Sequence, residues 1–511
     1  MDGWSCDAGP LEKGTGKMTD HNKSFGIVLL GLGPGDSNQL TRQAWEWLCQ
    51  IPEVYVRTRQ HLTLEGLPEG LKIVSFDDLY DRAERFEDVY EQIIARVLEL
   101  GQRPGGVTYA VPGHPFVAEA TCPEILRRAA ARGIPVRVIE GLSFLEPTFT
   151  ALGIDPFPHL ALVDALDVVS LHTPPFPPDQ PALIGQVYSR EVAAELKLTL
   201  NAVFPDQHIV RLVHAAGTPQ QLVEELPLYE IDRSQHIGLL TSLFLPSLGP
   251  QTSLESFQEI VAHLRAPDGC PWDKEQTQPS LAPSLVEEAY EALSAIEAGD
   301  SDGFREELGD LLLVVLMLAQ IASEDGDFAF TDVVSGIYSK IVRRHPHVFG
   351  DVTVQDSAGV LRNWEKLKED ERRAKGKADG DTPKGILDNI PKMLPALMQA
   401  QEYQDRAANV GFDWADIDGV VEKFEEEWRE VNQASDDDDR QKELGDLLFS
   451  VVNLVRWNKA DAETILRKAN LRFKERFDYI EQSARAQGRA LTGLSLEEME
   501  ALWQEAKKLS S

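Results

Sequence analysis

Two rhythms of hydrophobic and polar residues divide the chain near its middle. In the first half, short apolar runs alternate with amphipathic stretches, which predicts strands and helices in turn. The strands are expected at residues 25–30, 54–56, 106–111 and 136–139, and the helices at 87–100 and 122–132. Because strands and helices alternate in this way, we expect a mostly parallel α/β sheet.

In the second half, apolar residues recur every three or four positions, which is the spacing of amphipathic helices. The residues predicted to form the buried stripes of two helices are Leu285, Ala289, Leu293 and Ile296 in one, and Leu308, Leu311, Leu312 and Val315 in the other. The longest apolar run, at 311–319, is too short to span a membrane and predicts a helix buried on more than one side. The second half is therefore expected to be all-α.

An acidic motif occurs twice in this helical half. The hexapeptide at 307–312 recurs letter for letter at 443–448, and each copy follows a segment with the spacing E-E-x-x-E. Residues three or four apart share a helix face, so packing the helices together would gather four carboxylates in each copy. The two predicted sets are Glu288, Glu291, Glu307 and Asp310, and Glu427, Glu430, Glu443 and Asp446. Such carboxylates repel unless a cation lies between them, and the pattern predicts Mg²⁺ (or Mn²⁺) sites for a polyphosphate substrate.

Motifs around these acids resemble those of the MazG family. They lie at 269–277, 287–291, 307–310 and 343–349, while the segments 410–414 and 468–477 resemble the second repeat of tandem MazG proteins. The resemblance implies two helical repeats of a nucleoside triphosphate pyrophosphohydrolase, a hydrolase that releases a monophosphate and pyrophosphate. The catalytic residues that it implies are the eight acids above together with Glu287 and Glu426. Which acid acts as a general base, and whether both repeats are active, stays open.

A basic group follows each acid set. Arginine binds phosphate oxygens in a bidentate manner and lysine acts as a point charge, so these groups are candidates for binding a triphosphate. The predicted substrate-binding residues are Trp272, Lys340, Arg343 and Arg344 in the first repeat, and Lys468, Asn470, Arg472 and Arg476 in the second.

Three loops in the first half resemble those of the tetrapyrrole (corrin/porphyrin) methylases. The loops lie at 31–36, 111–115 and 141–143, and later segments at 162–165, 183–188, 215–219 and 241–246 fit as well. The resemblance implies two α/β lobes that bind S-adenosylmethionine (SAM) between them. The residues implied at the SAM site are Gly33, Pro34, Gly113, His114, Val117, Ser143, Phe144, Ala216, Gly217 and Thr218. Three roles stay open: methyl transfer to a tetrapyrrole-like or other small acceptor, SAM sensing without catalysis, and dimerisation.

Linkers and composition complete the expected organisation. We expect a disordered tail at 1–24, a methylase-like domain at 25–247, a MazG-like repeat at 254–370, a linker at 371–386 and a second repeat at 387–507. Thr252 or Ser253 is expected to cap the helix that follows the first linker. The four acids at 436–439 are expected to form a solvated loop without a ligand role.

The charge and the cysteines agree with a soluble cytoplasmic enzyme. With 84 acidic and 50 basic residues, the formal charge of −34 argues against binding of duplex nucleic acid. The four cysteines are scattered singly, as in reduced cytoplasmic proteins. We also expect a homodimer, because one repeat has too few helices to cover the apolar segment at 311–319.

Overall fold

The structure, a computed structural model, describes residues 26–80, 86–354, 385–388 and 390–509, together with positions 356, 359, 360, 363, 364, 367 and 371. The tail expected at 1–24 and most of the linker expected at 371–386 lie outside the described residues. The chain forms two compact units that divide after Ser335, and each is described by itself.

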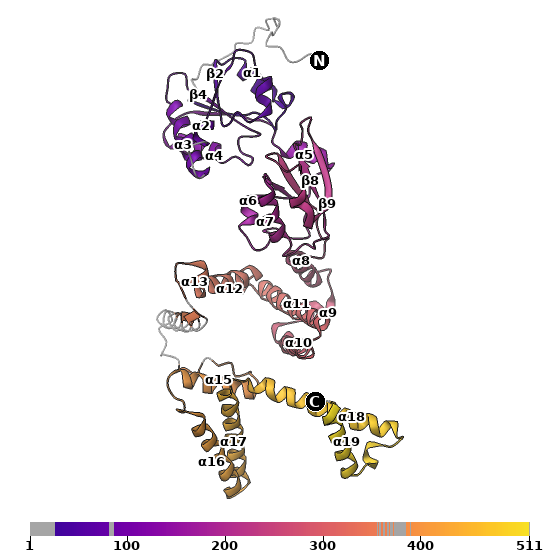
Figure 1. Ribbon diagram of the computed structural model, residues 1–511. Helices are drawn as coiled ribbons and strands as arrows, with labels where there is room; N and C mark the ends of the chain where they lie inside the picture. Colours follow the sequence, from indigo (N-terminus) through magenta and orange to yellow (C-terminus); the bar gives the residue numbers. More distant parts are fainter. Residues whose placement is uncertain are drawn as a thin grey trace. The chain divides into compact units, whose positions relative to one another are not determined.

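Five parallel strands form the sheet of the first lobe, in the order β3-β2-β4-β1-β5 (Figure 1). The strands are β1 (Ile27–Gly31), β2 (Glu53–Val56), β3 (Lys72–Ser75), β4 (Val107–Val111) and β5 (Val136–Ile139). The helices are α1 (Arg42–Leu48), α2 (Asp77–Tyr80), α3 (Phe86–Leu100) and α4 (Thr121–Ala131), with 3₁₀ turns η1 (Ser37–Gln39) and η2 (Leu62–Gly66). The four predicted strands and two predicted helices are confirmed, and the predictions missed β3.

The first sheet is buried on both faces, which explains why its central strands β1 and β4 are buried at every position and are almost entirely apolar. On one face, Ile93 of α3 and Ile125 of α4 pack with Tyr109. On the other face, Ala44 and Leu48 belong to α1 and pack in a second core. Because the strands are parallel, the loops after β1, β4 and β5 meet at one edge, where open sheets bind ligands.

The second lobe has a mixed sheet, in the order β6-β7-β10-β8-β9. Only the β6–β7 pair is parallel, so the expectation of a mostly parallel sheet holds for the first lobe alone. The strands are β6 (Ala161–Asp164), β7 (Ala182–Gly185), β8 (Ile209–His214), β9 (Leu222–Pro227) and β10 (Thr241–Leu245). The helices are α5 (Leu145–Leu152), α6 (Ala165–Val169) and α7 (Arg190–Leu200), with the 3₁₀ turn η3 (Leu228–Arg233).

Helices follow the second lobe. They are α8 (Leu254–Arg265), α9 (Pro271–Glu275), α10 (Gln278–Ala298), α11 (Ser301–Asp325) and α12 (Phe330–Arg344), which crosses the division between the units. Ser253 caps α8 as predicted, because its Oγ accepts a hydrogen bond from the Ser256 amide at 3.0 Å. Gly299 ends α10 at a φ of +67°, and Asp300 caps α11, so a short turn joins the two into a hairpin.

The stripes predicted to be buried in this hairpin are only partly covered. Five of the eight residues are exposed: Leu285, Leu293, Ile296, Leu308 and Leu312. Ala289, Leu311 and Val315 are half-buried. The hairpin packs instead through other apolar positions, and the core around Val261 of α8 contains Leu281, Leu316 and Met317. The buried residues of α11, which include Val314, Leu316 and Met317, lie on more than one side of the helix, as predicted for the run at 311–319, whereas α10 leaves most of its apolar stripe exposed.

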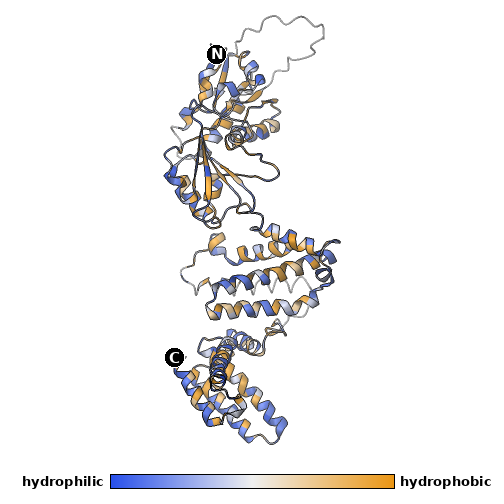
Figure 2. Cartoon of the chain, turned by 90° about the vertical axis from the view of Figure 1, so that its right-hand side faces the viewer, coloured by the Kyte–Doolittle hydropathy of each residue, from blue (hydrophilic) through white to orange (hydrophobic). Residues whose placement is uncertain are grey.

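The second unit is helical. Its helices are α13 (Pro346–Phe349), α15 (Ala396–Asn409), α16 (Ile417–Gln433), α17 (Asp437–Trp457), α18 (Ala462–Ala486) and α19 (Leu496–Leu509), with the 3₁₀ turn η4 (Leu491–Gly493). The helices α16 and α17 lie side by side, while α15 packs on α17 and α18 (Figure 1). Hydrophobic residues, drawn in orange in Figure 2, are spread along the helices of both units.

The prediction of a loop at 436–439 is wrong. Asp436 is the N-cap of α17, with its side chain accepting from the Asp439 amide at 2.9 Å, and the next three acids form the first helical turn. Acidic side chains are favourable there because they complement the partial positive charge of a helix N-terminus. As for the membrane prediction, no helix in the described ranges is both long and apolar enough to cross a bilayer.

Candidate functional sites

The first acid set gathers on the hairpin of α10 and α11. Carboxylate oxygens of Glu288, Glu291 and Glu307 lie within 4.8 Å of one another. Burial, followed by the charges of Asp310 and Glu291, raises the pKa of Glu288 above its ordinary value. Burial, followed by the charges of Glu291 and Asp310, likewise raises the pKa of Glu307. All four predicted acids therefore act on one another, and a cation between them would relieve the repulsion.

The second acid set forms in the same way on α16 and α17. Carboxylate oxygens of Glu427, Glu430 and Glu443 lie within 4.8 Å of one another. Burial raises the pKa of Glu443, and the charges of Glu430, Asp439 and Asp446 add to the effect. Asp439 was expected to lie in a solvated loop, but its charge acts on Glu443 and so belongs to the electrostatic environment of the second acid set.

The donor atoms of both acid sets fit a hard divalent cation. They are carboxylate oxygens, without the thiolates or imidazoles that favour zinc or copper. Mg²⁺ is bound by one or two carboxylates, several waters and substrate phosphates, so an open group of three or four acids suits it.

A lysine distinguishes the second acid set from the first. The Nζ of Lys423 lies 2.7 Å from Glu427 and 2.9 Å from Glu426, which raises the pKa of Lys423. Glu427 is only 5% exposed, so this ion pair compensates its buried charge. At the corresponding position of the first repeat, four residues before Glu288, the chain has the uncharged Ser284. The i, i+4 spacing of Lys423 and Glu427 was a signal that the sequence predictions missed.

The basic group of the first repeat is engaged by an acid of its own unit. Arg343 and Arg344 lie 2.7 and 2.6 Å from the carboxylate of Glu371, whose pKa is lowered to about 2 by these hydrogen bonds, Arg344 first. Lys340 lies on the same helix, α12, and is exposed. A phosphate that binds these arginines would therefore compete with Glu371 for some of their N–H donors.

The second basic group lies along α18. Lys468, Asn470 and Arg472 are exposed there, as a group that binds a substrate from solvent would be. The guanidinium of Arg476 instead lies over the ring of Trp503, 5.7 Å from its centroid. Trp272, the predicted contact on α9, is 64% exposed.

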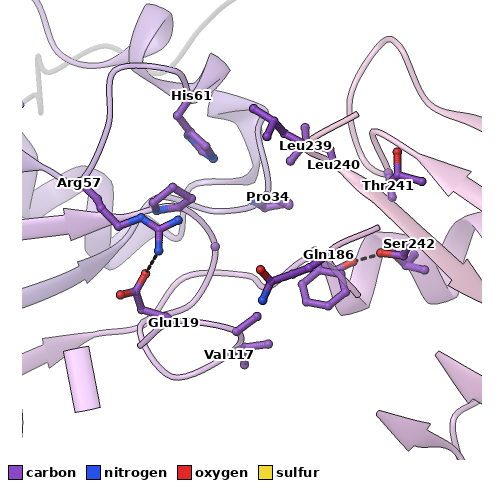
Figure 3. A pocket seen from close by; sticks show the side chains of 16 residues that line it. Pro34, Arg57, His61, Val117, Glu119, Gln186, Leu239, Leu240, Thr241 and Ser242 are labelled. Atoms are coloured by element: carbon purple, nitrogen blue, oxygen red, sulfur yellow. Dashed lines mark hydrogen bonds and ion pairs between the residues drawn. The ribbon is translucent and has the colours of Figure 1, made fainter. Parts of the chain in front are cut away.

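A cavity of about 190 Å³ lies between the two lobes of the first half (Figure 3). Five of the ten residues predicted at the SAM site line it: Pro34, Gly113, Val117, Phe144 and Ala216. Figure 3 shows Arg57, His61 and Glu119 on the side of the first lobe and Leu239 and Leu240 on the side of the second.

The other five predicted residues build the loops around this cavity. Gly33 and Gly113 exchange backbone hydrogen bonds. Ser143 donates to Glu146 at 2.6 Å, while His114 accepts from the Phe116 amide at 3.1 Å. The last two residues form hydrogen bonds within their own loop. The Gly217 amide donates to the Gln221 side chain, and the Thr218 hydroxyl donates to the Ala215 carbonyl.

Two further glycines let these loops approach. A Cβ on Gly31 would lie 2.5 Å from the Gly113 carbonyl oxygen, and one on Gly141 would meet the same oxygen at 2.5 Å. Gly31 at the end of β1 and Gly141 after β5 are therefore required for the close packing between these loops.

Polar residues that the sequence did not indicate face the same cavity. Arg57 Nη1 donates to the buried carboxylate of Glu119 at 2.5 Å. Burial, with a contribution from the charge of Arg57, lowers the pKa of His61 to about 4, so its imidazole is neutral at neutral pH. An adjoining cavity of about 440 Å³ shares His61, Leu239 and Leu240 with the first.

Strained backbone gathers around these two cavities. Ala118, Gln186 and Ala215 have φ values of 50°, 63° and 47°, in the left-handed region that non-glycine residues rarely adopt. Ala118 and Gln186 line the smaller cavity and Ala215 lines the larger one. Such strain persists where the surroundings hold it and is typical of ligand sites.

Comparisons with known proteins match the α/β half and the helical half of the chain to two different family models. The model of the tetrapyrrole (corrin/porphyrin) methylases matches residues 26–232, and that of the MazG nucleotide pyrophosphohydrolase domain matches residues 276–349. The second match contains the first acid set, and the second acid set lies beyond it.

Individual relatives cover one half or the whole chain. The uncharacterized protein YabN of Bacillus subtilis (strain 168) is 42% identical over 495 residues, 94% of this chain and 98% of YabN. The nucleoside triphosphate pyrophosphohydrolase of Escherichia coli (strain K12) is 47% identical over 255 residues, 49% of this chain and 95% of that protein. The solved uroporphyrin-III-C-methyltransferase from Thermus thermophilus is 22% identical, with a TM-score of 0.36, over 43% of this chain and 94% of the other.

Proposed function

Because the chain belongs to the family that joins a tetrapyrrole methylase domain to a MazG nucleotide pyrophosphohydrolase domain, we propose that its helical half is a metal-dependent pyrophosphohydrolase. The substrates are nucleoside triphosphates, and the products are the monophosphate and pyrophosphate. The observation that supports this most strongly is the gathering of three glutamates within 4.8 Å on each of two helix hairpins.

The acid sets are proposed to hold Mg²⁺ or Mn²⁺. A divalent cation held there would supply positive charge to offset that of the phosphates and would lower the pKa of a bound water. Glu288, Glu291, Glu307 and Asp310 would hold the ion in the first repeat, and Glu427, Glu430, Glu443 and Asp446 would hold it in the second. Glu287 and Glu426 stand next to these sets, and an acid that does not bind the metal is free to take the proton from water.

Basic side chains are proposed to neutralise the remaining phosphate charge. The exposed candidates are Lys340 on α12 and Lys468 and Arg472 on α18. In the second repeat, Lys423 also holds a positive charge beside the acid set, 2.7 Å from Glu427.

Removal of each acid set tests the proposal. The doubles Glu288→Gln/Glu291→Gln and Glu427→Gln/Glu430→Gln are each expected to reduce hydrolysis, and their combination is expected to eliminate it. The matched control is Glu306→Gln/Glu425→Gln, which removes exposed carboxylates from the same helices outside the acid sets. If either double leaves both the rate and the metal affinity unchanged, the repeat that carries it has a structural role only.

For the first half we propose SAM binding in the cavity between the lobes. Its lining combines apolar side chains with Gln186, Ser242 and the Arg57–Glu119 pair, which suits a ligand with an apolar thioether region, a carboxylate and an amino group. The strained backbone at Ala118 and Gln186 supports a ligand site there. Methyl transfer to a tetrapyrrole-like or other small acceptor and SAM sensing remain the two alternatives.

Calorimetry with SAM and the full chain tests this second proposal. Wild-type protein is expected to bind SAM, and Val117→Arg, which places a long charged side chain in the cavity, is expected to abolish binding. Leu198→Arg, at a 70% exposed position of α7, serves as the control and is expected to bind normally. Binding by Val117→Arg with unchanged affinity would place the SAM site elsewhere. Methyl transfer to an acceptor would distinguish an enzyme from a sensor.

A further inference from the structure

A third cavity, of about 400 Å³, adjoins the acid set of the second repeat. Glu427 and Asp446 form part of its wall. Its aromatic lining consists of Tyr403, Phe412, Trp414 and Phe449. An aromatic cavity beside a group of carboxylates has the chemistry of a nucleotide site, with stacking faces for a planar ring next to oxygen ligands for a metal and phosphates.

One polar side chain in this wall is oriented for a ligand. Gln404 on α15 is 8% exposed, and its Nε2 donates to the backbone carbonyl of Phe449 at 2.8 Å. Since a carbonyl oxygen only accepts hydrogen bonds, this contact fixes which end of the amide is nitrogen. The Oε1 of Gln404 is then left buried without a hydrogen-bond partner. A buried acceptor without a partner is costly, so it indicates a donor that is supplied from outside the chain.

The neighbouring polar groups are satisfied within the protein. Asn453 Oδ1 accepts from Arg456 Nε at 2.9 Å, and Arg456 in turn lies 2.7 Å from Asp413. The hydroxyl of Ser450 donates to the Leu447 carbonyl at 2.8 Å. Among the described residues that line the cavity, Gln404 has the one buried side-chain atom without a partner.

We propose that this cavity binds the nucleobase of the triphosphate and that Gln404 Oε1 selects bases with an exocyclic amino group. The proposal rests on the hydrolysis proposed above and adds to it the base and the residue that recognises it. The exocyclic group extends furthest from the ring of the base, and in this proposal it is the group that contacts Gln404 Oε1. An amino group offers only N–H donors there, whereas an oxo group would set its lone pairs against those of Oε1.

Matched pairs of substrates test the selectivity. In the full chain with Glu288→Gln/Glu291→Gln, which leaves hydrolysis to the second repeat, kcat/KM is compared for ATP with ITP and for CTP with UTP. At least one amino-bearing member is expected to be preferred roughly tenfold or more, the factor for one buried hydrogen bond lost and one acceptor left unpaired. Gln404→Leu in the same background is expected to bring that ratio close to one.

Gln401→Leu is the matched control. Gln401 lies one turn earlier on α15, and both ends of its amide are bonded within the chain, to the Ala460 carbonyl and the Ala462 amide. This variant is expected to keep the base preference. Calorimetry with AMP, IMP, CMP and UMP, without metal, gives a second measure of the same preference that does not depend on catalysis.

The outcomes separate the two proposals. Equal kcat/KM within both pairs for the parent protein overturns the role of Gln404, and so does a preference that Gln404→Leu retains. Hydrolysis by the wild-type chain that disappears in the Glu288→Gln/Glu291→Gln background shows that the cavity of the second repeat serves no substrate, and overturns this inference alone. Failure of the wild-type chain to hydrolyse any triphosphate overturns the proposed function itself.

Discussion

At the scale of single residues, the closeness of like charges determines the pKa values of the acid sets. Carboxylates within a few ångström of one another repel, and partial burial weakens the solvent screening that would reduce this repulsion. The pKa values of Glu288, Glu307 and Glu443 are raised accordingly. Without a cation, repulsion between the ionised carboxylates destabilises the folded state. Binding of a metal ion is therefore expected to raise the free energy of unfolding.

This coupling predicts a pH-dependent effect of Mg²⁺ on stability. A carboxyl group with a raised folded pKa contributes stability that is present below the ordinary value of 4.5 and is lost as pH rises through the folded pKa. We therefore expect Mg²⁺ to raise the melting temperature near neutral pH, where the carboxylates are ionised, and much less at pH 4.5. Glu307→Gln/Glu443→Gln should weaken this effect, and Glu306→Gln should not. A Mg²⁺ effect of equal size at both pH values would contradict the coupling.

The sequence revealed the acid sets because their chemistry is encoded locally, in carboxylates three or four residues apart that occur twice. Gln404 had no such signal, since its role depends on the carbonyl of Phe449, 45 residues away in the chain. His61 and Arg57 had no signal in the sequence either. Arg57 pairs with Glu119, which is distant in the sequence, so its place in the cavity wall depends on the fold.

At the scale of elements, helix ends follow side-chain capping. The first turn of α8 is held from two directions, because Ser253 Oγ accepts from the Ser256 amide and also donates to Asp179 at 2.6 Å. The Ser256 hydroxyl bonds the same carboxylate oxygen. Asp179 thereby anchors the start of the helical half to the second lobe.

Ser253→Ala is expected to lower the stability of this first turn by about 1 kcal/mol, the usual cost of removing an N-cap side chain. Hydrogen exchange of the backbone amides at 254–257 measures it, and exchange there should become faster. Thr252→Ala is the control, since Thr252 Oγ1 donates to the Gly249 carbonyl, which lies before the helix. Unchanged exchange in Ser253→Ala would mean that packing alone holds the turn.

Two errors in the predicted elements have physical causes. The four acids at 436–439 look solvated by charge alone, but an Asp followed three residues later by another Asp satisfies the capping pattern of a helix start. The stripe at Leu293 and Ile296 was predicted from spacing, which identifies an amphipathic helix and leaves open which of its apolar faces the chain covers.

At the scale of the whole molecule, exposed apolar residues remain after the chain has folded. Ile296 is 54% exposed on α10, and Val334, Ile337 and Tyr338 on α12 are exposed as well. Val334, Ile337 and Tyr338 recur at helical spacing on α12, and exposed apolar residues that share a helix face often mark an interaction site. A second copy of the chain is our proposed partner, in line with the homodimer expected from the sequence.

Light scattering at micromolar concentration tests the dimer. We expect a mass of two chains, because symmetric contacts would cover the apolar residues of both copies. Ile296→Glu/Ile337→Glu is expected to shift the mass toward one chain, and Leu198→Glu, at an exposed position of α7, is the control. A mass of one chain at every concentration, with full activity, would rule the dimer out.

Identification of the products from a panel of triphosphates with Mg²⁺ tests the central claim most directly. The metal-dependent site proposed at each acid set predicts equal amounts of nucleoside monophosphate and pyrophosphate, no hydrolysis in excess EDTA, and recovery when Mg²⁺ or Mn²⁺ is restored. Undiminished turnover in excess chelator, or release of inorganic phosphate with a nucleoside diphosphate, would contradict the account.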